Sequence, residues 1–461
     1  YAIPDHPWVD ESGAAAVRIA MTVVDTKDAI GTCDQVTAEK QSGEEPILPG
    51  YTRTTGRLNA LLSCGVDISQ MSGARLASNA GISFMGIIPV GAGFRVSQAD
   101  VELLGFSTAS LPSVIRPYLN GKDLARRSRE GYIIDFFGLS ADEAKLRYPS
   151  LFQRVIDHVK PERDQNNDQK FRTEWWLFGR PRPEMREALS GLNRFIGTPE
   201  TAKHRYFLFL DASILPDQKI RVVASDTALL LGVLSSRIHC LWATTTGARV
   251  GKGNDPVYNN TTCFEPFPFP QCSKQVQDSI AAIGDQLDAH RKKRQESHPG
   301  LMLTDMYNVL EKLRAGEELS DKDKLIHEQG LVSVLKQIHE DLDKAVFAAY
   351  AWPANLTDEQ ILERLVALNA ERAAEEARGL IRWLRPEFQA PQDAQERQGE
   401  LALPKDEDAE PTKKPKPAKA GKAPWPKERA ERTKAIQDAL AASIAPVTPP
   451  ELAKQFLRGN A

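Results

Sequence analysis

The sequence predicts an α+β protein in which a mixed middle region is followed by a bundle of helices. Between residues 57 and 272, short apolar runs rich in valine, isoleucine and phenylalanine alternate with short helical patterns. After Pro270 the apolar residues recur at three- and four-residue spacing, as on the buried faces of amphipathic helices. These two observations set the fold class, and a strand-like opening precedes them.

The opening residues, 1–25, predict a hairpin. The run "AAVRIAMTVV" is almost continuously apolar, as in a strand buried on both faces, and a loop containing Pro7 and Trp8 precedes it. Because the chain opens on "YAIPDHPWVD" without methionine, we expect a fragment that begins inside a domain. Residues 26–50 are polar and contain glycine and proline, and we interpret them as a linker.

The middle region, residues 51–272, contains strand-like and helical segments. The strand candidates are "ISFMGIIPV", "GYIIDFF", "RYFLFLDASI" and "KIRVVAS". "SADEAKLRYP" predicts a short helix in which Ser140 is the cap, Glu143 completes a capping box and Pro149 ends the helix. "DTALLLGVLSSRIHCLWA" predicts a second helix, because its apolar residues form a stripe at helical spacing.

Residues 273–390 predict the helical bundle. Three apolar faces support it: Val276, Ile280, Ile283 and Leu287; Leu303, Tyr307, Leu310 and Leu313; Leu331, Leu335, Ile338 and Leu342. Residues 391–424 are rich in proline, lysine, glutamate and alanine and predict a disordered linker. Residues 425–461 predict a short helical tail with a small apolar face.

The stretch "NNTTCFEPFPFP" at residues 259–270 marks the boundary between middle region and bundle. Proline has no backbone donor and disfavours helix in the residue before it, so two Phe-Pro steps keep the backbone extended. Phe267 and Phe269 can anchor this hinge in apolar pockets. A rigid domain connector explains the stretch without any functional role.

The composition excludes several classes of protein. The net charge is −3, so a nucleic-acid site must be a local patch. The five cysteines and eight histidines have no metal-ligand spacing, so we expect no bound metal and a reducing compartment. No apolar run reaches the roughly 18 residues of a membrane span. We therefore expect a cytoplasmic protein with no membrane partner.

Two motifs resemble nucleotide or nuclease sites but fail on spacing. "GARVGKG" has three residues, where a Walker loop needs four, and no Ser or Thr after its lysine, although Lys252 could still approach one phosphate. Asp135, Glu143 and Lys145 faintly resemble a metal nuclease, but the capping box already explains Glu143.

Arginine, lysine and asparagine recur in the polar loops of the middle region, and these residue types bind phosphates and base edges. We predict DNA contacts from Arg163, Asn166, Arg172, Arg180, Arg182, His204, Arg205, Arg237, Lys252, Asn254, Asn259 and Asn260. Together they predict a concave face that grips a duplex. Solvated surface is the alternative for each residue alone, and Trp175 and Trp176 suit a core better than base stacking.

Several phrases, in order, resemble bacterial adenine-N6 DNA methyltransferases of the large, single-chain restriction–modification kind. They include "HPWVDESGAAAVRIAMTVV", "IRPYLNGKDL", "VKPERDQNNDQKFRTEWWLFGRPRP", "GLNRFIGTPETAKHRYFLFL" and "CFEPFPFP", and "LTDEQILERLVALNAERAAEEARGLIRWLRPEFQ" resembles the closing segment. The resemblance covers residues 1–390. It implies the end of a Rossmann-like methyltransferase sheet at residues 1–25, a target-recognition domain at residues 51–272, and then the bundle.

The resemblance also implies a division of labour. In this family an (Asp/Asn)-Pro-Pro-(Tyr/Phe) motif holds a flipped adenine and a separate loop binds S-adenosylmethionine, and neither motif is present here. Asp255-Pro256 continues Val-Tyr instead. We therefore expect an adenine-specific methyltransferase as the intact protein, with this chain alone inactive and free of cofactor. Trp8 would contact the flipped base, or else plug the end of the sheet.

Two hypotheses for function follow. In the first, the chain recognises double-stranded DNA for methylation of adenine N6. In the second, it is a non-catalytic scaffold or specificity subunit that binds a separate methylase or restriction protein.

Overall fold

The computed structural model describes residues 1–8, 17–24, 30–42, 45–59, 62–64, 74–126, 131–250, 255–391, 423–424 and 456–457. The chain divides into two compact units, residues 1–397 and 398–461. In the second unit the described residues are a short parallel pair, β15 (Ala423–Pro424) and β16 (Phe456–Leu457). Most of the predicted linker and helical tail lie outside the described residues, and β16 is a strand where the sequence predicted helix.

The first four strands form one sheet in the order β2-β1-β3-β4. Strands β1 (Ala2–Trp8) and β2 (Val17–Thr22) pair antiparallel, which confirms the predicted hairpin. Strand β2 lies at the sheet edge, and Val23 and Val24 beyond it are 67% and 91% exposed, so the expectation of a strand buried on both faces is wrong for this end of the chain.

The predicted linker at residues 26–50 is also wrong, because strands occupy much of it. Strands β3 (Gly31–Ser42) and β4 (Glu45–Gly56) form a long antiparallel pair. Their sequences are polar, so they lack the apolar alternation that marks a half-buried strand. The backbone groups pair with each other instead, and the buried Asp34 accepts hydrogen bonds from Arg53 at 2.7 and 2.6 Å.

The middle region holds two further four-stranded sheets. The first has the order β10-β9-β12-β5 and the second the order β11-β7-β8-β6. Their strands are β5 (Ser83–Met85), β6 (Arg95–Val96), β7 (Ile115–Leu119), β8 (Tyr132–Ile134), β9 (Arg194–Pro199), β10 (Leu208–Asp211), β11 (Leu215–Pro216) and β12 (Ile220–Val223). The predicted strand segments supply β5, β8, β10 and β12. Between β10 and β12 the chain crosses to the second sheet as β11 and returns, which joins the two sheets side by side.

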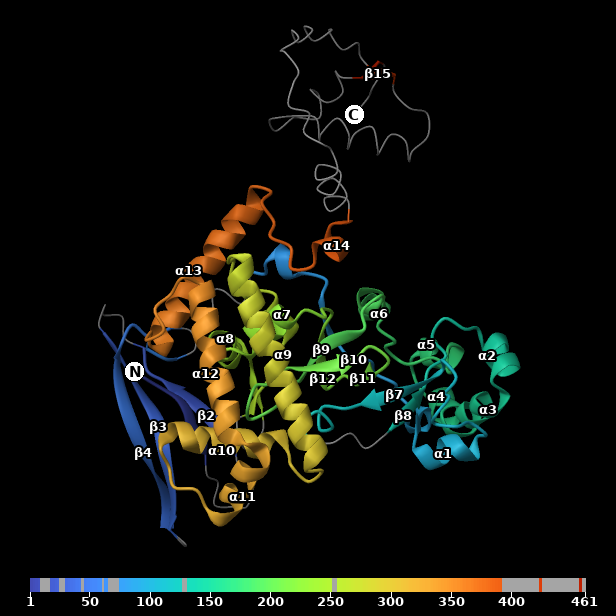
Figure 1. Cartoon of the computed structure of the whole chain (residues 1–461), viewed down its shortest axis with the longest axis horizontal. Helices are drawn as coiled ribbons and strands as arrows, with labels where there is room; N and C mark the ends of the chain where they lie inside the picture. The colour runs from blue at the N-terminus through green and yellow to red at the C-terminus, as the bar shows by residue number, and fades with distance from the viewer. Residues whose placement is uncertain are drawn as a thin grey trace. The chain divides into compact units, whose positions relative to one another are not determined.

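Short helices surround these sheets. They are α1 (Gln98–Leu103), α2 (Ala141–Arg147), α3 (Pro149–His158), α4 (Lys160–Asp164), α5 (Gln169–Thr173) and α6 (Pro183–Leu189). Helices α2 to α5 gather beyond β7 and β8, on the other side of the β9–β12 sheet from the long helix α9 (Figure 1). The capping box of Ser140 and Glu143 is confirmed at the start of α2, and Pro149 begins α3 directly afterwards.

The helix predicted at residues 226–243 is broken into α7 (Ala228–Ser235) and α8 (Arg237–Thr246). The break is at Ser236, whose hydroxyl accepts the His239 N–H and so caps a new helix. The two helices meet at 62°. In the described part of the chain, this bent pair alone has the length and hydropathy of a membrane span, and no single helix does.

The hinge is anchored as predicted. Phe267 is completely buried, and Phe269 packs edge-to-face against it with 4.9 Å between ring centroids. The Asn79 amide donates to the carbonyls of Phe264, Glu265 and Phe267 at 3.2, 2.9 and 2.7 Å. The extended backbone of the hinge therefore finds its hydrogen bonds in a segment nearly two hundred residues earlier.

The bundle follows the hinge. Its helices are α9 (Lys274–Ser297), α10 (Leu303–Ala315), α11 (Asp321–Gly330), α12 (Val332–Ala349), α13 (Asp358–Ala377) and α14 (Pro386–Gln389). Residues of each predicted face are buried, although Leu331 is a half-exposed cap. Gly284 lets α9 approach α7 closely, because a Cβ there would lie 2.5 Å from the Ala228 carbonyl oxygen. One apolar core runs through both the middle region and the bundle. The mixed sheets of the middle region, followed by the helices of the bundle, confirm the α+β class.

Candidate nucleic-acid interface

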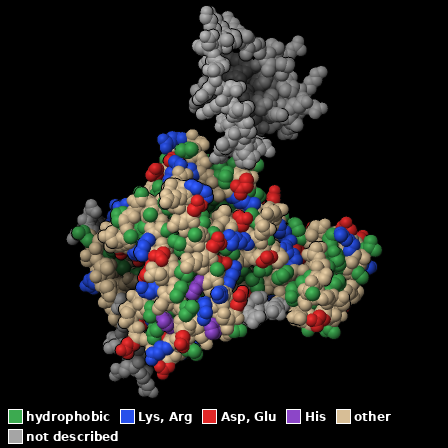
Figure 2. Space-filling view, in the orientation of Figure 1, with side chains coloured by type: hydrophobic (Ala, Val, Ile, Leu, Met, Phe, Trp, Pro, Cys, Tyr) green, Lys and Arg blue, Asp and Glu red, His purple; other side chains and the backbone are tan. Residues whose placement is uncertain are grey.

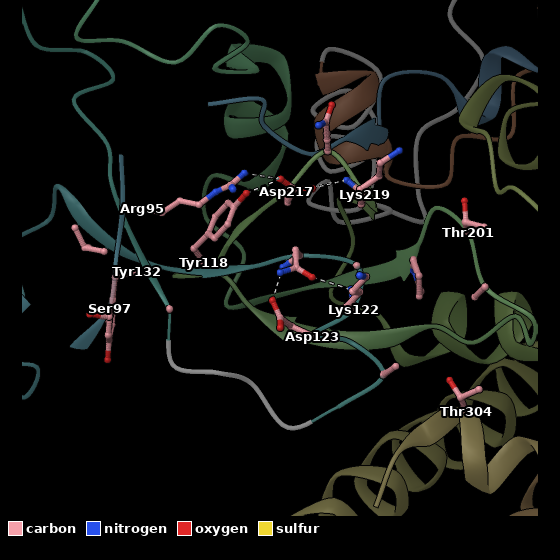
Figure 3. Close-up of a pocket in the computed structure, with 18 of the residues that line it drawn as sticks. Arg95, Ser97, Tyr118, Lys122, Asp123, Tyr132, Thr201, Asp217, Lys219 and Thr304 are labelled. Atoms are coloured by element: carbon pink, nitrogen blue, oxygen red, sulfur yellow. Dashed lines mark hydrogen bonds and ion pairs between the residues drawn. The ribbon is translucent and has the colours of Figure 1, made fainter. Parts of the chain in front are cut away.

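A groove of about 1150 Å³ lies where the two middle sheets meet. Strand β6, the turn after β7, the end of β9 and the crossing segment before β12 form its walls, and Thr304 in α10 closes one end (Figure 3). Because the chain crosses between the two sheets here, these four segments and their polar residues lie around one groove.

The turn after β7 is fixed by its own sequence. The Asn120 side chain accepts the Lys122 N–H at 2.9 Å, and the Asp123 carboxylate accepts the Asn120 N–H at 2.9 Å. Gly121 lies so close to the opposite wall that a Cβ would approach the Lys219 carbonyl oxygen to 2.8 Å. The turn therefore holds Lys122 exposed at the groove while Asp123 stays buried.

The charges that reach solvent in the groove are positive. The four lining cations Arg95, Lys122, Lys203 and Lys219 are all exposed. The lining acids Asp123 and Asp217 are buried at 7% and 5% exposure. Over the face of the molecule in Figure 2, by contrast, basic and acidic side chains are interspersed.

Two of these lysines already have acidic partners just outside the groove. Lys219 lies 2.6 Å from Glu200, and Lys203 lies 3.2 Å from Glu311 of α10. Both lysines are more than half exposed, so the pairs are weak and open to exchange. A polyanion in the groove can therefore bind these two lysines in place of their present partners, with no change in the fold.

Arg95 is held differently. Its guanidinium lies over the Tyr118 ring, 5.4 Å from the centroid, and its Nη2 is 3.8 Å from Asp217 Oδ2. Tyr118 donates its hydroxyl to the same Asp217 oxygen at 2.5 Å. Arg95 and Tyr118 converge on Asp217 in Figure 3. Burial, together with the Asp217 carboxylate, raises the pKa of Tyr118, so its hydroxyl remains a donor.

Residues 85–271 match the family model described as "MmeI, target recognition domain". This segment is similar to the target recognition domain of that family, and we refer to residues 85–271 as the target recognition domain. Apart from Thr304, every residue that lines the groove belongs to the target recognition domain.

Two longer proteins are similar to this chain. A solved structure of the Type IIL restriction-modification enzyme MmeI in complex with DNA shares its fold, with a TM-score of 0.59 at 17% identity, and the match covers 81% of this chain and 46% of that one. DNA methyltransferase A of Bacillus subtilis (strain 168) is 25% identical over 235 residues, which is 49% of this chain and 23% of that protein. The chain thus spans less than half the length of either relative.

Two predicted DNA contacts are instead structural parts of the target recognition domain. Arg163 is 1% exposed and donates to the carbonyls of Val90, Pro89 and Leu177 at 2.8, 2.8 and 3.0 Å. Arg205 is 7% exposed and donates to Thr198 Oγ1 at 3.1 Å and to the Pro256 carbonyl at 3.0 Å. Burial lowers the pKa of both guanidinium groups. The prediction that they contact DNA is wrong, because their donors are already used inside the fold.

Four other predicted residues of the domain are half-buried or exposed. Arg182 has φ of 57° and donates to the Gly86 carbonyl at 3.2 Å, and burial lowers its pKa. Arg172 is exposed in α5 and donates to the carbonyl of the half-buried Asn166. Arg180 is exposed, while its backbone pairs with Ile88. They lie apart from the groove lining, and their role in DNA contact stays a prediction.

His204 and Arg237 face the bundle instead. His204 lies 2.8 Å from Asn308 Oδ1 of α10, and burial lowers its pKa. Arg237 pairs with Asp358 of α13 at 2.5 Å. Since α5, α10 and α13 are different parts of the molecule, the predicted residues do not share one concave face (Figure 1).

The remaining predicted residues lie near the chain's undescribed segments. Lys252, Asn254 and the Trp8 side chain are outside the described residues. Asn259 and Asn260 are half-buried where the π-helix η4 (Asn260–Phe264) begins.

The loop before Asn259 does reach the groove. It contains the short hairpin of β13 (Arg249–Val250) and β14 (Asp255–Pro256). Val257 then bridges to Thr201 at the groove wall, and the Tyr258 N–H donates to the Glu200 carbonyl at 2.7 Å. The predicted loop therefore flanks the groove through these contacts.

The sequence interpretation missed Arg95, Lys122 and Lys219. Each is an isolated cation at the end of a short strand or in a tight turn, in "GFRVS", "LNGKD" and "PDQKI". The clusters of arginine, on which the predicted contacts depended, lie in other segments. The available signal for the two lysines is an Asn-Gly or Asp-Gln pair followed by lysine, a sequence typical of a surface turn. For Trp175 and Trp176 the core interpretation is confirmed, since both pack against the main core and the Trp176 indole donates to the Leu139 carbonyl at 3.0 Å.

Proposed function

We propose that the target recognition domain binds duplex DNA along this groove, and that the intact protein transfers a methyl group from S-adenosylmethionine to adenine N6. The observation that carries the proposal is the coincidence of two findings: the match to a target recognition family and a groove of exposed cations within the matched residues. The relatives add support, since one is described in complex with DNA and the other is named a DNA methyltransferase.

The groove cations give the proposal its physics. Duplex DNA carries one negative charge per roughly 1.7 Å of helix axis, and each neutralised phosphate releases condensed counterions. Lys122, Lys203 and Lys219 end in flexible ammonium groups that suit phosphates in varied geometry. The buried acids Asp123 and Asp217 fix the walls without presenting negative charge to the ligand.

The residues that come nearest to the methyltransferase motif do not fit a flipped adenine. The nearest approach to the methyltransferase motif is Asp255-Pro256-Val257-Tyr258. Tyr258 is completely buried, and its hydroxyl lies 3.0 Å from His239 Nε2, so its ring cannot stack on an extruded base. Any methyl transfer by the intact protein must therefore use residues other than these, and we assign no catalytic step to this motif.

A titration of the 461-residue chain with a labelled duplex tests the proposal. Fluorescence anisotropy between 50 and 200 mM salt should give a slope of log K against log[salt] of about −2 to −4, because up to four groove cations each contribute about −0.9. Replacing Lys122 and Lys219 together by alanine should weaken binding. Replacing the exposed Lys344 of α12 by alanine is the matched control and should leave binding unchanged.

Two outcomes would reject the proposal. Affinity that does not change with salt means that phosphates are not bound. A chain that binds no duplex but co-purifies with a separate methylase or restriction subunit supports the scaffold hypothesis instead.

A further inference from the structure

Arg95 differs from the other groove cations in its freedom to move. Lysine side chains end in a point charge on a flexible stem, whereas arginine presents a planar fork of N–H donors. In this groove the fork lies over the Tyr118 ring, with Arg95 Cζ 5.4 Å from the ring centroid. The Arg95 side chain is nonetheless 55% exposed, so the fork is oriented and accessible at once.

Asp217 attracts the Arg95 guanidinium but does not occupy its hydrogen-bond donors. Its Oδ2 is bonded to the Tyr118 hydroxyl at 2.5 Å and its Oδ1 accepts the Lys219 N–H at 2.9 Å. The distance of 3.8 Å from Asp217 Oδ2 to Arg95 Nη2 is too long for a hydrogen bond, so the attraction is one of charge. The donors of Arg95 are therefore not tied up by Asp217.

The buried arginines of the same domain show the contrast. Arg163 and Arg205 direct their donors at backbone carbonyls within the fold. Arg95 is the groove arginine, and it faces an open volume of about 1150 Å³. A planar fork held in this way matches a ligand with two acceptors side by side, such as O6 and N7 of guanine or two oxygens of one phosphate.

We propose that Arg95 binds a paired acceptor of duplex DNA in the groove, and that Tyr118 and Asp217 are positioning residues that fix its guanidinium plane. This proposal rests on the proposed function, because Arg95 lies in the same groove. It assigns to Arg95 a directional, hydrogen-bonded contact in addition to the attraction of charge. Guanine and phosphate share the acceptor chemistry, and experiment separates them.

The test combines affinity, salt dependence and base preference for the full chain. Wild type, Arg95→Ala and Arg95→Lys are each titrated with duplex DNA and used to select bound duplexes from a randomised library. Arg95→Ala should lower affinity about 5- to 100-fold, as expected for a bidentate contact. If the acceptor is guanine, one guanine preference disappears in Arg95→Ala and in Arg95→Lys. If it is a phosphate, affinity falls uniformly across sequences and the salt slope of Arg95→Ala shrinks by about 0.9.

The positioning residues need a readout that folding alone does not move. Tyr118→Phe keeps the ring and removes the hydroxyl, so the Asp217 carboxylate is left free to close on Arg95. We expect this variant to lose the contact between Arg95 and DNA. The part of the slope of log K against log[salt] that comes from the three lysines should remain. Circular dichroism melting checks that it remains folded. The matched arginine control is Arg378→Ala, because Arg378 is exposed at the end of α13 in the bundle.

Failure of this inference differs from failure of the proposed function. If wild type binds duplex DNA with a salt-dependent affinity but folded Arg95→Ala matches it in affinity, slope and base preference, Arg95 has no such role and the function stands. If wild type binds no duplex, both fall together. Native affinity, slope and base preference in folded Tyr118→Phe would remove the positioning role alone.

Discussion

Two kinds of arginine occupy the target recognition domain, and comparing them shows how placement decides function. Arg163 and Arg205 are buried and donate to main-chain carbonyls, whereas Arg95 is half-exposed over an open groove. All three carry the same charge and lie within the same matched segment. The buried pair holds main-chain segments of the domain together, and the exposed residue faces the groove.

Each buried arginine joins separate main-chain segments, and the end of β9 that Arg205 holds borders the groove. Arg205 joins Thr198 and Pro199 at the end of β9 to Pro256 of the flanking hairpin. Arg163 joins Pro89 and Val90 to Leu177. Guanidinium groups suit this task because one planar fork satisfies several carbonyls that would otherwise be buried without donors.

Replacing Arg205 by methionine should have the largest effect on stability. The variant leaves the carbonyls of Pro199 and Pro256 without their donor, and we expect a loss of about 3 to 5 kcal/mol in unfolding free energy. Urea denaturation followed by circular dichroism measures it. Arg378→Met on the exposed end of α13 is the control and should change stability by less than about 0.5 kcal/mol. A stable Arg205→Met that loses only DNA affinity would contradict the comparison.

Sequence patterns predicted amphipathic helices of the bundle, the hinge, and the strands β5, β8, β10 and β12 of the middle region, because periodicity and proline chemistry are local. The capping box at Ser140 and the anchoring of Phe267 are of this kind. Patterns did not separate Arg163 from Arg95, since burial depends on contacts between residues more than seventy positions apart. The strands β3 and β4 were missed for a related reason: a polar hairpin is stabilised by its pairing, which composition does not encode.

Buried histidines extend the comparison to groups that must stay neutral. Burial, with Arg205 nearby, lowers the pKa of His239 to about 3, and the ring packs among Phe207, Phe267 and Tyr258. The unfolded chain binds a proton near pH 6.5 and the folded one does not, so stability is lost as the pH falls below that value. His239 alone should account for about 2 kcal/mol between pH 7 and 5.

The variant His239→Gln isolates that contribution. Its unfolding free energy should depend less on pH by this amount, whatever its absolute stability. The reference for this comparison is wild type, unfolded under the same conditions at each pH. The difference between wild type and variant is needed because Asp343 changes the stability of the protein in the opposite direction. Burial raises the pKa of Asp343 to about 6, so this residue makes the folded protein more stable as the pH falls. An unchanged pH slope in His239→Gln would mean that the histidine is protonated in the folded state.

The smallest effects should come from the groove lysines, and their order tests whether existing ion pairs matter. Lys219 lies 2.6 Å from Glu200 and must exchange that partner for a phosphate, whereas no described acidic residue pairs with Lys122. We therefore expect Lys122→Ala to lower DNA affinity about 3- to 10-fold, roughly 1 kcal/mol, and Lys219→Ala to lower it less. Glu200 stays paired with Arg221 at 2.6 Å in the second variant, so its carboxylate does not turn into the groove. Anisotropy at two salt concentrations ranks the two variants by their loss of DNA affinity.

A larger loss of affinity in Lys219→Ala than in Lys122→Ala would contradict this expectation. It would show that Lys219, beside Glu200 at the end of β9, approaches the duplex more closely than Lys122 does.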